Sequence, residues 1–252
     1  MTLQARIDYF RYASQDHSTP LFSDLHLAAE LGQSLAIVGR SGSGKSTLAR
    51  LLSGLTASHD IVRASVTCDG MEVKQPHSPV VLVLQDYKRA VFPWMTVADN
   101  IRLGKRSARE ETVHLVARSL NIEPLLYSYP ANLSGGQIQR VQIARAVLSD
   151  AKYIVFDEPT SSLDIELRDS VLEAVQRVID DGNRGCIYVT HRLEETIFVA
   201  DRVRVLRVPG NGPRVLSEEL RITRRKVNSQ FWTHLDSSAL ADLVTIEREL
   251  RR

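Results

Sequence analysis

The loop Gly39–Thr47 constrains the fold of this chain more than any other segment. It reads Gly-Arg-Ser-Gly-Ser-Gly-Lys-Ser-Thr and follows Gln33–Val38, a short and mostly apolar run that is typical of a buried strand. Glycines without a Cβ let successive backbone N–H groups turn toward one anion, and a helix over Ser46–Leu52 would add its positive dipole. A strand, a glycine-rich loop and a helix in this order predict a phosphate-binding α/β fold.

Each position of the loop has an expected part in nucleotide binding. The Lys45 ammonium can reach the β and γ phosphates, and the Ser46 hydroxyl is a hard oxygen ligand that suits Mg²⁺. A chance match is the alternative, but the glycines, the lysine and the hydroxyl fall in order between a predicted strand and a predicted helix. The residues expected around the phosphates are Gly39, Arg40, Ser41, Gly42, Ser43, Gly44, Lys45, Ser46 and Thr47.

Composition narrows the class of protein further. The 43% of hydrophobic residues can fill a core, whereas 32 basic against 30 acidic residues give no global electrostatic case for nucleic acid. The longest apolar run, Val80–Leu84, is far shorter than the roughly 20 residues that cross a bilayer. Arg6 and Asp8 stand where a signal peptide would be apolar, so no export is expected. Cys68 and Cys186 lack metal-site spacing and are expected to be small buried residues in a reducing cytosol.

The order of predicted elements indicates three parts. Residues 1 to about 35 alternate polar and apolar around a turn-rich break at Ser14–Pro20, which predicts antiparallel strands. Short strands are expected near Val66–Cys68 and Val80–Leu84, and residues 87–149 carry helical patterns that predict an inserted α-helical subdomain. Its clearest helices are expected over Arg109–Leu120 and Gln137–Leu148.

The last third of the chain returns to the sheet. Tyr153–Phe156 and Cys186–Thr190 read as buried parallel strands, with a helix over Glu166–Asp180 between them. Arg202–Val208 alternates like a strand, and a final amphipathic helix is expected. The leucines expected on that helix are Leu235, Leu240, Leu243 and Leu250. We expect one nucleotide-binding domain over residues 1–220 and a short basic, helical tail over residues 221–252.

Two carboxylates follow the strand predicted at Tyr153–Phe156. Asp157 and Glu158 would lie at the carboxyl edge of the sheet, where ligands of open α/β folds bind. Taken alone, an apolar run followed by two acids is more often a strand end with solvated side chains. The phosphate loop upstream makes a catalytic interpretation the better one.

A second glycine-rich segment, Leu133–Gln137, opens the predicted helix that runs to Leu148. Its serine and glycines offer hydroxyl and backbone donors together with a helix dipole. A simple turn before a helix is the alternative, but the downstream pairs Gln139-Arg140 and Ala144-Arg145 fit the same pattern. With this segment, the phosphate loop and the paired acids, the chain resembles the ATP-binding cassette (ABC) ATPases. The resemblance covers essentially the whole chain.

The resemblance implies a phosphate-loop NTPase core and a role for each residue around the ATP. Asp157 would hold Mg²⁺, Glu158 would polarise the attacking water, and Gln85 would touch both the metal and the water. His191 matches the histidine that contacts the γ phosphate, although a lone histidine is more often structural. Asp164 falls in the segment that ties the two active sites of a dimer together.

The resemblance also implies a site shared between two subunits. Ser134, Gly135, Gly136 and Gln137 would cap the ATP that the other subunit holds, with two domains meeting head to tail. Tyr12 is expected to stack on the adenine. Tyr9 is the alternative residue for stacking on the adenine. The alternative role for Tyr12 is that of a strand residue that packs on the sheet.

The segment Gln85–Asn100 resembles that of importer ATPases, particularly the nitrate, sulfonate and taurine group. Phe92 and Trp94 suit a groove for a short permease helix, with core packing as the rival interpretation. The implied partners are a second ABC ATPase subunit, expected to be an identical copy, permease subunits and, indirectly, an extracytoplasmic solute-binding protein. The expected place is the cytoplasmic face of the inner membrane. The basic run Arg221–Lys226 could contact anionic lipid, but a solvated stretch is the favoured interpretation.

Some residues depart from the family pattern. Arg192 stands where an aspartate is common, Gln142 stands at a usually small position, and Ile138 is a milder variation. We expect none of them to touch the chemistry. A soluble ABC ATPase that acts on DNA or ribosomes is the alternative function. A single cassette without a heptad run or a CxxC pair favours transport, and no nucleic-acid partner is expected.

Overall fold

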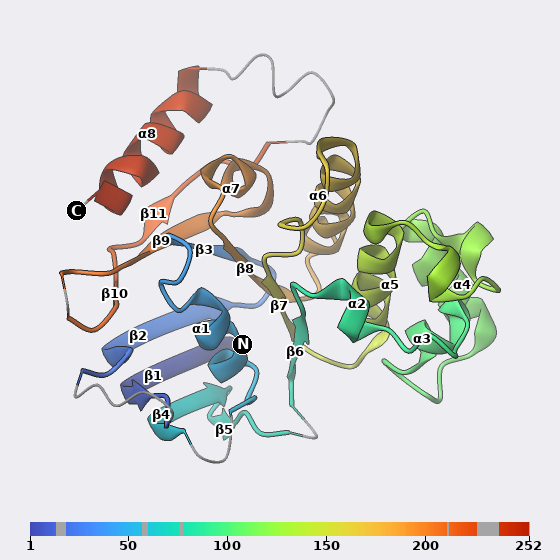
Figure 1. Ribbon diagram of the computed structural model, residues 1–252, viewed down its shortest axis with the longest axis horizontal. Helices are drawn as coiled ribbons and strands as arrows, with labels where there is room; N and C mark the ends of the chain where they lie inside the picture. The colour runs from blue at the N-terminus through green and yellow to red at the C-terminus, as the bar shows by residue number, and fades with distance from the viewer. Residues whose placement is uncertain (14–18, 57–59, 76–77, 211, 226–236, 252) are drawn as a thin grey trace.

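The structure, a computed structural model, describes residues 1–13, 19–56, 60–75, 78–210, 212–225 and 237–251. Figure 1 shows two sheets with a helix between them and further helices on the outside. The strands are β1 Thr2–Arg11, β2 Phe22–Glu30, β3 Ser34–Val38, β4 Ile61–Cys68, β5 Met71–Glu72, β6 Val80–Val83, β7 Tyr153–Asp157, β8 Gly185–Thr190, β9 Arg202–Arg207, β10 Val215–Leu216 and β11 Leu220–Arg221.

The helices are α1 Lys45–Leu52, α2 Tyr87–Ala90, α3 Val97–Arg102, α4 Glu110–Ser119, α5 Gly135–Leu148, α6 Ile165–Asp180, α7 Leu193–Val199 and α8 Ser237–Arg251, with short 3₁₀ turns at Glu123–Leu125 and Pro130–Asn132. The α/β fold class is confirmed. Within the described ranges, no helix is long and apolar enough to span a membrane.

The central sheet carries the functional residues. Its strand order is β10-β9-β3-β8-β7-β6, and β11 also pairs with β9. Strands β9, β3, β8, β7 and β6 run parallel, whereas β10 and β11 run antiparallel to β9. Every residue of β3, β7 and β8 is buried, as expected for parallel strands covered on both faces. Because these strands are parallel, the loops after β3, β6, β7 and β8 all leave the same edge of the sheet.

The second sheet is antiparallel and has the order β2-β1-β4-β5. Alternate residues of β1 are buried, among them Leu3, Ala5 and Ile7, and a register shift after Ile7 brings Phe10 to the buried face as well. One apolar cluster joins this face to α1 and to the central sheet, so α1 is held between the two sheets. The antiparallel N-terminal strands are thus confirmed, while residues 14–18 of the expected break lie outside the described residues.

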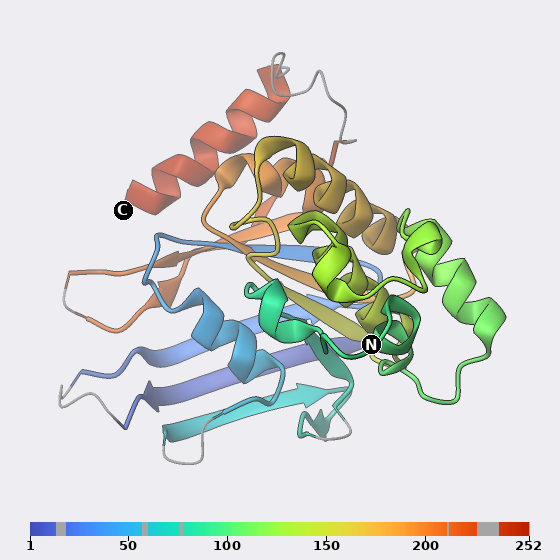
Figure 2. The same ribbon diagram turned by 45° about the vertical axis from the view of Figure 1, so that its right-hand side comes forward.

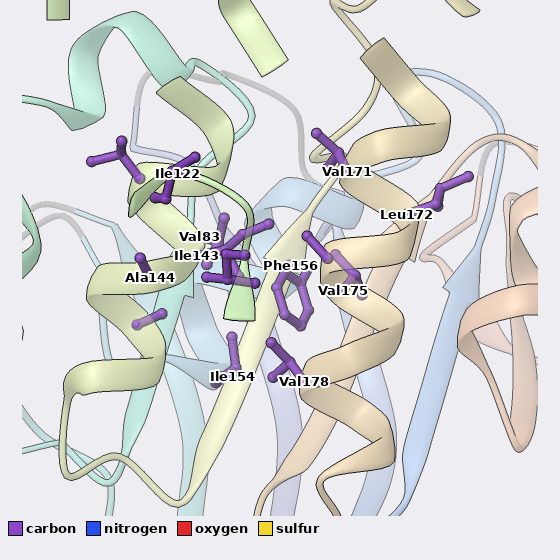
Figure 3. Close-up of a cluster of buried hydrophobic side chains, with 14 of the residues drawn as sticks. Val83, Ile122, Ile143, Ala144, Ile154, Phe156, Val171, Leu172, Val175 and Val178 are labelled. Carbon is purple, nitrogen blue, oxygen red and sulfur yellow. The ribbon is translucent and has the colours of Figure 1, made fainter. Parts of the chain in front are cut away.

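The helical part is joined to the central sheet by shared packing. Figure 3 shows Phe156 of β7 beside Val175 and Val178 of α6, with Ile143 of α5 close by. These side chains belong to one buried cluster that continues into α3 and α4. Figures 1 and 2 place α3 and α4 near the β6 end of the sheet and α8 near β9, at the other end. Helix α5 therefore connects the core with the outer helices.

Helix α8 differs from the expected pattern of its leucines. Leu243 and Leu250 pack against buried clusters, but Leu240 is 47% exposed and Leu235 lies outside the described residues. The residues that the helix buries are Ala239 and Ile246. Leu240 lies on this helix as expected but beside its buried face, because that face is formed by residues at the i, i+4, i+7 and i+11 spacing of one helix stripe: Ala239, Leu243, Ile246 and Leu250.

Candidate nucleotide-binding site

The loop between β3 and α1 has a backbone that only glycine fits at key positions. A Cβ on Gly39 would lie 2.7 Å from Ser43 Oγ and 2.9 Å from the carbonyl oxygen of Leu206. Gly44 stands at the N-cap of α1 with φ 99°, in the left-handed region that side chains disfavour. The loop therefore closes tightly and leads directly into the N-terminus of α1, as the sequence predicts.

Lys45 holds this loop together. Its ammonium Nζ donates to the carbonyl oxygens of Gly39 and Arg40, at 2.9 and 3.0 Å, and lies 3.2 Å from Glu158 Oε1. The residue is only 4% exposed. In addition, Ser43 Oγ is buried in the loop with no hydrogen-bond partner among the described residues. A buried cation and an unsatisfied hydroxyl beside a helix N-terminus fit a phosphate group.

Two hard oxygen ligands lie together at the start of α1. Ser46 Oγ donates to Asp157 Oδ1 at 2.9 Å, which joins the phosphate loop to the end of β7. Burial raises the pKa of the Asp157 carboxyl, while the Ser46 hydrogen bond opposes that change. A hydroxyl and a carboxylate are the donors that Mg²⁺ prefers, so this pair fits the metal that the sequence predicts.

Glu158 and His191 meet at the same edge of the sheet. Glu158 has φ 46°, an uncommon left-handed conformation for a residue with a side chain, and its N–H donates to the Val189 carbonyl at 2.9 Å. The Glu158 carboxylate lies between two nitrogens, with Oε1 facing Lys45 and Oε2 2.9 Å from His191 Nδ1. A carboxylate, an ammonium and an imidazole from three separate segments thus form one row of contacting side chains.

Gln85 reaches the segment that follows Glu158. Its Nε2 donates to Ser161 Oγ at 3.1 Å, and the Ser161 hydroxyl donates to the Glu158 carbonyl at 3.0 Å. The hydrogen bond that the structure gives to the Gln85 amide therefore goes to Ser161, three residues after Glu158. Gln85 follows β6, so all four loops of this edge contribute to the site.

Sequence reasoning missed one charged group behind this edge. Glu195 in α7 is fully buried and accepts three hydroxyl donors: Thr160 at 2.6 Å, Thr190 at 2.8 Å and Tyr188 at 3.1 Å. Burial raises its carboxyl pKa above the ordinary value, and the three donors oppose that shift. Thr160 follows Glu158 closely and Thr190 precedes His191, so Glu195 braces both loops. The sequence offers little signal for this role, because Glu195 stands between Glu194 and Thr196 in the first turn of the helix.

Tyr12 lies against the start of α1. Its hydroxyl hydrogen-bonds the Thr47 hydroxyl, and its ring packs edge-on to Phe10 with 5.1 Å between the centroids. The side chain is half-buried, so one part faces the phosphate loop while another part remains accessible. This position is compatible with packing on the sheet and with contact to a base. Tyr9, in β1, is likewise half-buried.

The second glycine-rich segment starts helix α5 and forms a capping box. Ser134 Oγ accepts from the Gln137 N–H at 3.3 Å, and the Ser134 N–H donates to Gln137 Oε1 at 2.8 Å. A Cβ on Gly135 would lie 2.8 Å from the Tyr87 hydroxyl, and one on Gly136 would lie 3.2 Å from Leu167. Within one chain, the structure does not bring this turn into hydrogen-bond contact with Lys45, Asp157 or Glu158 among the described residues.

Asp164 is engaged in a local role. Its Oδ1 accepts the Leu167 N–H at 2.9 Å and so caps the N-terminus of α6. The Asp164 side chain is exposed. Its segment contacts the turn Ser134–Gln137, which we call the signature turn, through Leu163 and Leu167. A role between two active sites stays a prediction.

The fold and these contacts define a nucleotide-binding ATPase domain. A model of the ABC transporter family matches residues 22–161. The aliphatic sulfonates import ATP-binding protein SsuB of Bacillus licheniformis is 29% identical, over 92% of this chain and 91% of that protein. The energy-coupling factor transporter ATP-binding protein EcfA1 of Lactobacillus delbrueckii is 36% identical, over 79% and 74%. The chain belongs to the ABC transporter family and is an ATPase of that family.

A third relative is similar only in part of its length. The sn-glycerol-3-phosphate import ATP-binding protein UgpC 1 of Rhizobium johnstonii is 36% identical, over 78% of this chain and 53% of that protein. All three relatives carry ATP-binding in their names, so the likeness follows the nucleotide-binding part. This agrees with the sequence-based prediction of an ATP site.

Proposed function

We propose that this chain is the ATP-hydrolysing subunit of an importer and works as a head-to-tail dimer with two ATP molecules between its copies. The observation that carries the proposal is the position of the Glu158 carboxylate beside the phosphate loop, in contact with Lys45 on one side and His191 on the other. The exposed signature turn, Ser134–Gln137, is the second part of the proposal. The signature turn has no lysine or carboxylate of its own, and the phosphate-loop side lacks the hydroxyl and backbone donors of that turn.

The residues around the loop divide the chemistry between them. The loop amides and Lys45 bind the phosphates, while Ser46 and Asp157 would hold Mg²⁺, which neutralises phosphate charge when bound. Glu158 accepts a proton from the attacking water, and His191 holds the Glu158 carboxylate in place. Gln85, linked to this segment through Ser161, places the water. Tyr12 stacks on the adenine above the start of α1.

The signature turn completes the site of the partner subunit. The N-terminus of α5 offers the backbone N–H groups of Gly135 and Gly136 beside the Ser134 hydroxyl. Once its capping box opens, these donors can bind the γ phosphate held by the other copy. Asp164, at the neighbouring start of α6, lies on the surface that would face the partner.

A permease is the proposed membrane partner. The relatives named above include import proteins for aliphatic sulfonates, and a similar organic anion is the proposed solute. Trp94 is 71% exposed and Phe92 is 41% exposed, with 5.4 Å between their ring centroids. Exposed aromatic rings of this size are typical of protein interfaces and suit a short permease helix. The subunit would lie at the cytoplasmic face of the inner membrane, with a solute-binding protein on the far side.

Glu158→Gln tests the dimer. The amide cannot accept the proton of water, so turnover is expected to fall by about 10²–10⁴ while ATP binding persists. A dimer trapped with Mg-ATP should then appear on a sizing column. A variant that stays monomeric, or that hydrolyses ATP at the wild-type rate, would contradict the proposal.

Affinity capture from detergent-solubilised membranes tests the importer. The full chain should bring down integral membrane subunits and, through them, a solute-binding protein. A Trp94→Ala variant should lose most of that capture and keep its ATPase activity. Recovery of rRNA or DNA without a membrane protein would favour the soluble alternative instead.

A further inference from the structure

A buried asparagine closes the loop that carries the two exposed aromatic rings. Asn100 in α3 is fully buried, and its Nδ2 donates to the carbonyl oxygens of Phe92, Met95 and Thr96 at 3.0 to 3.1 Å. Its Oδ1 accepts the Phe92 N–H at 2.9 Å. We call residues 92–96 the aromatic loop. Four hydrogen bonds to one side chain give this surface loop a fixed shape.

Arg145 attaches the aromatic loop to helix α5. Its guanidinium donates to the Asn100 carbonyl at 2.8 Å, to Asn100 Oδ1 at 2.9 Å and to the Ala90 carbonyl at 2.5 Å. It also lies 5.9 Å from the centroid of the Phe92 ring. Among the described residues no carboxylate pairs with Arg145, and burial lowers its pKa. A mostly buried cation held only by carbonyl dipoles and a ring costs desolvation energy that a purely apolar contact would avoid.

Two further contacts bind the same segment to α5. A Cβ on Gly104 would lie 2.1 Å from the Arg145 carbonyl oxygen, so only glycine lets the end of α3 come this close. Gln142, the unusual residue one turn earlier, accepts the Leu84 N–H at 3.2 Å through its Oε1. Leu84 directly precedes Gln85. Helix α5 therefore contacts the stretch 84–104, which includes the aromatic loop, at both of its ends. Gln142 thus bonds the residue before Gln85, while its expected lack of contact with the chemistry stays a prediction.

Helix α5 leads from these contacts to the signature turn. Arg145 lies eleven positions after Ser134, which corresponds to about 16 Å along a helix that rises 1.5 Å per residue. We propose that Arg145 and Asn100 are positioning residues that fix the aromatic loop to α5, so that the loop and the signature turn move as one body. This rests on the proposed function, in which a permease helix contacts Phe92 and Trp94 and the Ser134 turn closes on ATP.

The effect of ATP binding on the aromatic loop can be measured without a permease, because coupling between two sites acts in both directions. In a Trp232→Phe background Trp94 is the only tryptophan, and the Glu158→Gln change traps the ATP state. Acrylamide quenching of Trp94 is measured without nucleotide and with Mg-ATP, and dimer formation is followed on a sizing column. Because a loop that is fixed to α5 is carried along when the signature turn closes on ATP, we expect the surroundings of Trp94 to change. The quenching constant should then shift at least about 1.5-fold on ATP trapping in this reference protein.

Arg145→Lys is the test variant, because lysine keeps the charge but lacks the planar fork of donors with which Arg145 reaches Ala90 and Asn100 together. We expect it to lose at least half of the ATP-dependent change in quenching and to form the dimer as the reference does. Arg118→Lys, the same substitution at an exposed arginine of α4, is the control and should retain both properties. Should Arg145→Lys fail to fold by circular dichroism, Asn100→Ser takes its place in the same comparison.

Each outcome decides the question. A full ATP-dependent change in the folded test variant overturns the proposal. A parallel loss of dimer formation also overturns it, since that is what a general structural role would cause. If the reference protein forms the dimer without any Trp94 response, the inference fails and the proposed function stands. If the reference forms no dimer, both fail.

Discussion

The phosphate-loop edge and the signature turn treat their polar groups in opposite ways. At the phosphate-loop edge, side chains from separate loops contact one another, with the buried Lys45 and the more exposed His191 on either side of Glu158. At the signature turn, the exposed Ser134 and Gln137 satisfy each other's backbone through a capping box. The first region is assembled within one chain. The second is a complete helix start, which in the proposed dimer would exchange its local hydrogen bonds for hydrogen bonds to phosphate.

Removing the ammonium of the first region is expected to have the largest effect. Lys45→Ala deletes the cation that links two loop carbonyls to Glu158 and that would meet the phosphates. A lost charged donor in a buried site is typically worth about 3–4 kcal/mol, so ATP affinity should fall by about 100-fold or more. Titration with a fluorescent ATP analogue measures this. Lys152→Ala, which removes a more exposed lysine, is the control, and equal affinity in the two variants would refute the assignment.

Changing the second region should separate binding from turnover. Ser134→Arg places a bulky side chain at the helix start while the phosphate loop of the same chain stays intact. ATP binding to the isolated subunit should remain within about twofold, whereas dimer-dependent turnover should fall by about 100-fold, the scale of a lost donor. Phosphate release under saturating ATP gives the rate. The control Ser107→Arg adds the same charge at an exposed loop, and normal hydrolysis by Ser134→Arg would contradict the shared site.

The sequence predicted the phosphate-loop edge well for a simple geometric reason. Parallel strands end at one edge, so residues that directly follow buried strands come together whatever their separation along the chain. This placed Lys45, Glu158 and His191 correctly near one another. It also indicated Gln85 on the same edge, although the partner of its amide, Ser161, was not foreseen.

Side chains that act across elements were beyond sequence reasoning. Glu195 and Arg145 both lie in helices, and their roles depend on which loops pack beside them rather than on local pattern. Gln142 was noticed only as a departure from the family, and its contact with Leu84 needed the tertiary structure. The two-residue strands at Val215–Leu216 and Leu220–Arg221 were also missed, because so short a run has no measurable periodicity.

A smaller effect is expected at Tyr12, which borders the phosphate loop. If its ring stacks on adenine, Tyr12→Ala should weaken ATP binding by about 5- to 10-fold, within the 1–3 kcal/mol typical of base–aromatic stacking. Tyr12→Phe keeps the ring and loses only the hydrogen bond to Thr47, so its affinity should stay within about twofold. Equal losses in both variants would assign the effect to the hydroxyl, and a loss in Tyr9→Ala instead would move the role to Tyr9.

The brace behind the phosphate-loop edge should have the smallest effect, visible in the pH dependence of stability. Burial raises the pKa of Glu195, so the folded state holds its proton more tightly than the unfolded state does. The stability from this group is complete below its ordinary pKa and is lost as the pH rises through the raised value. Glu195→Gln removes that loss, and each tenfold change in acid dissociation constant is worth about 1.4 kcal/mol. The free energy of unfolding should therefore fall less in the variant as the pH rises above 4.5, the ordinary pKa of the carboxyl.

Urea unfolding at several pH values measures this difference. Asp157 has a pKa shifted in the same direction, so it contributes to both proteins and cancels when the two curves are subtracted. Glu111→Gln, at an exposed glutamate of α4, serves as the control and should follow the wild type. Parallel curves for Glu195→Gln and the wild type would mean that the three hydroxyl donors fully offset the burial of the carboxylate. In that case the brace would be independent of pH, and the phosphate-loop edge would keep its charges in place at no cost to stability from Glu195.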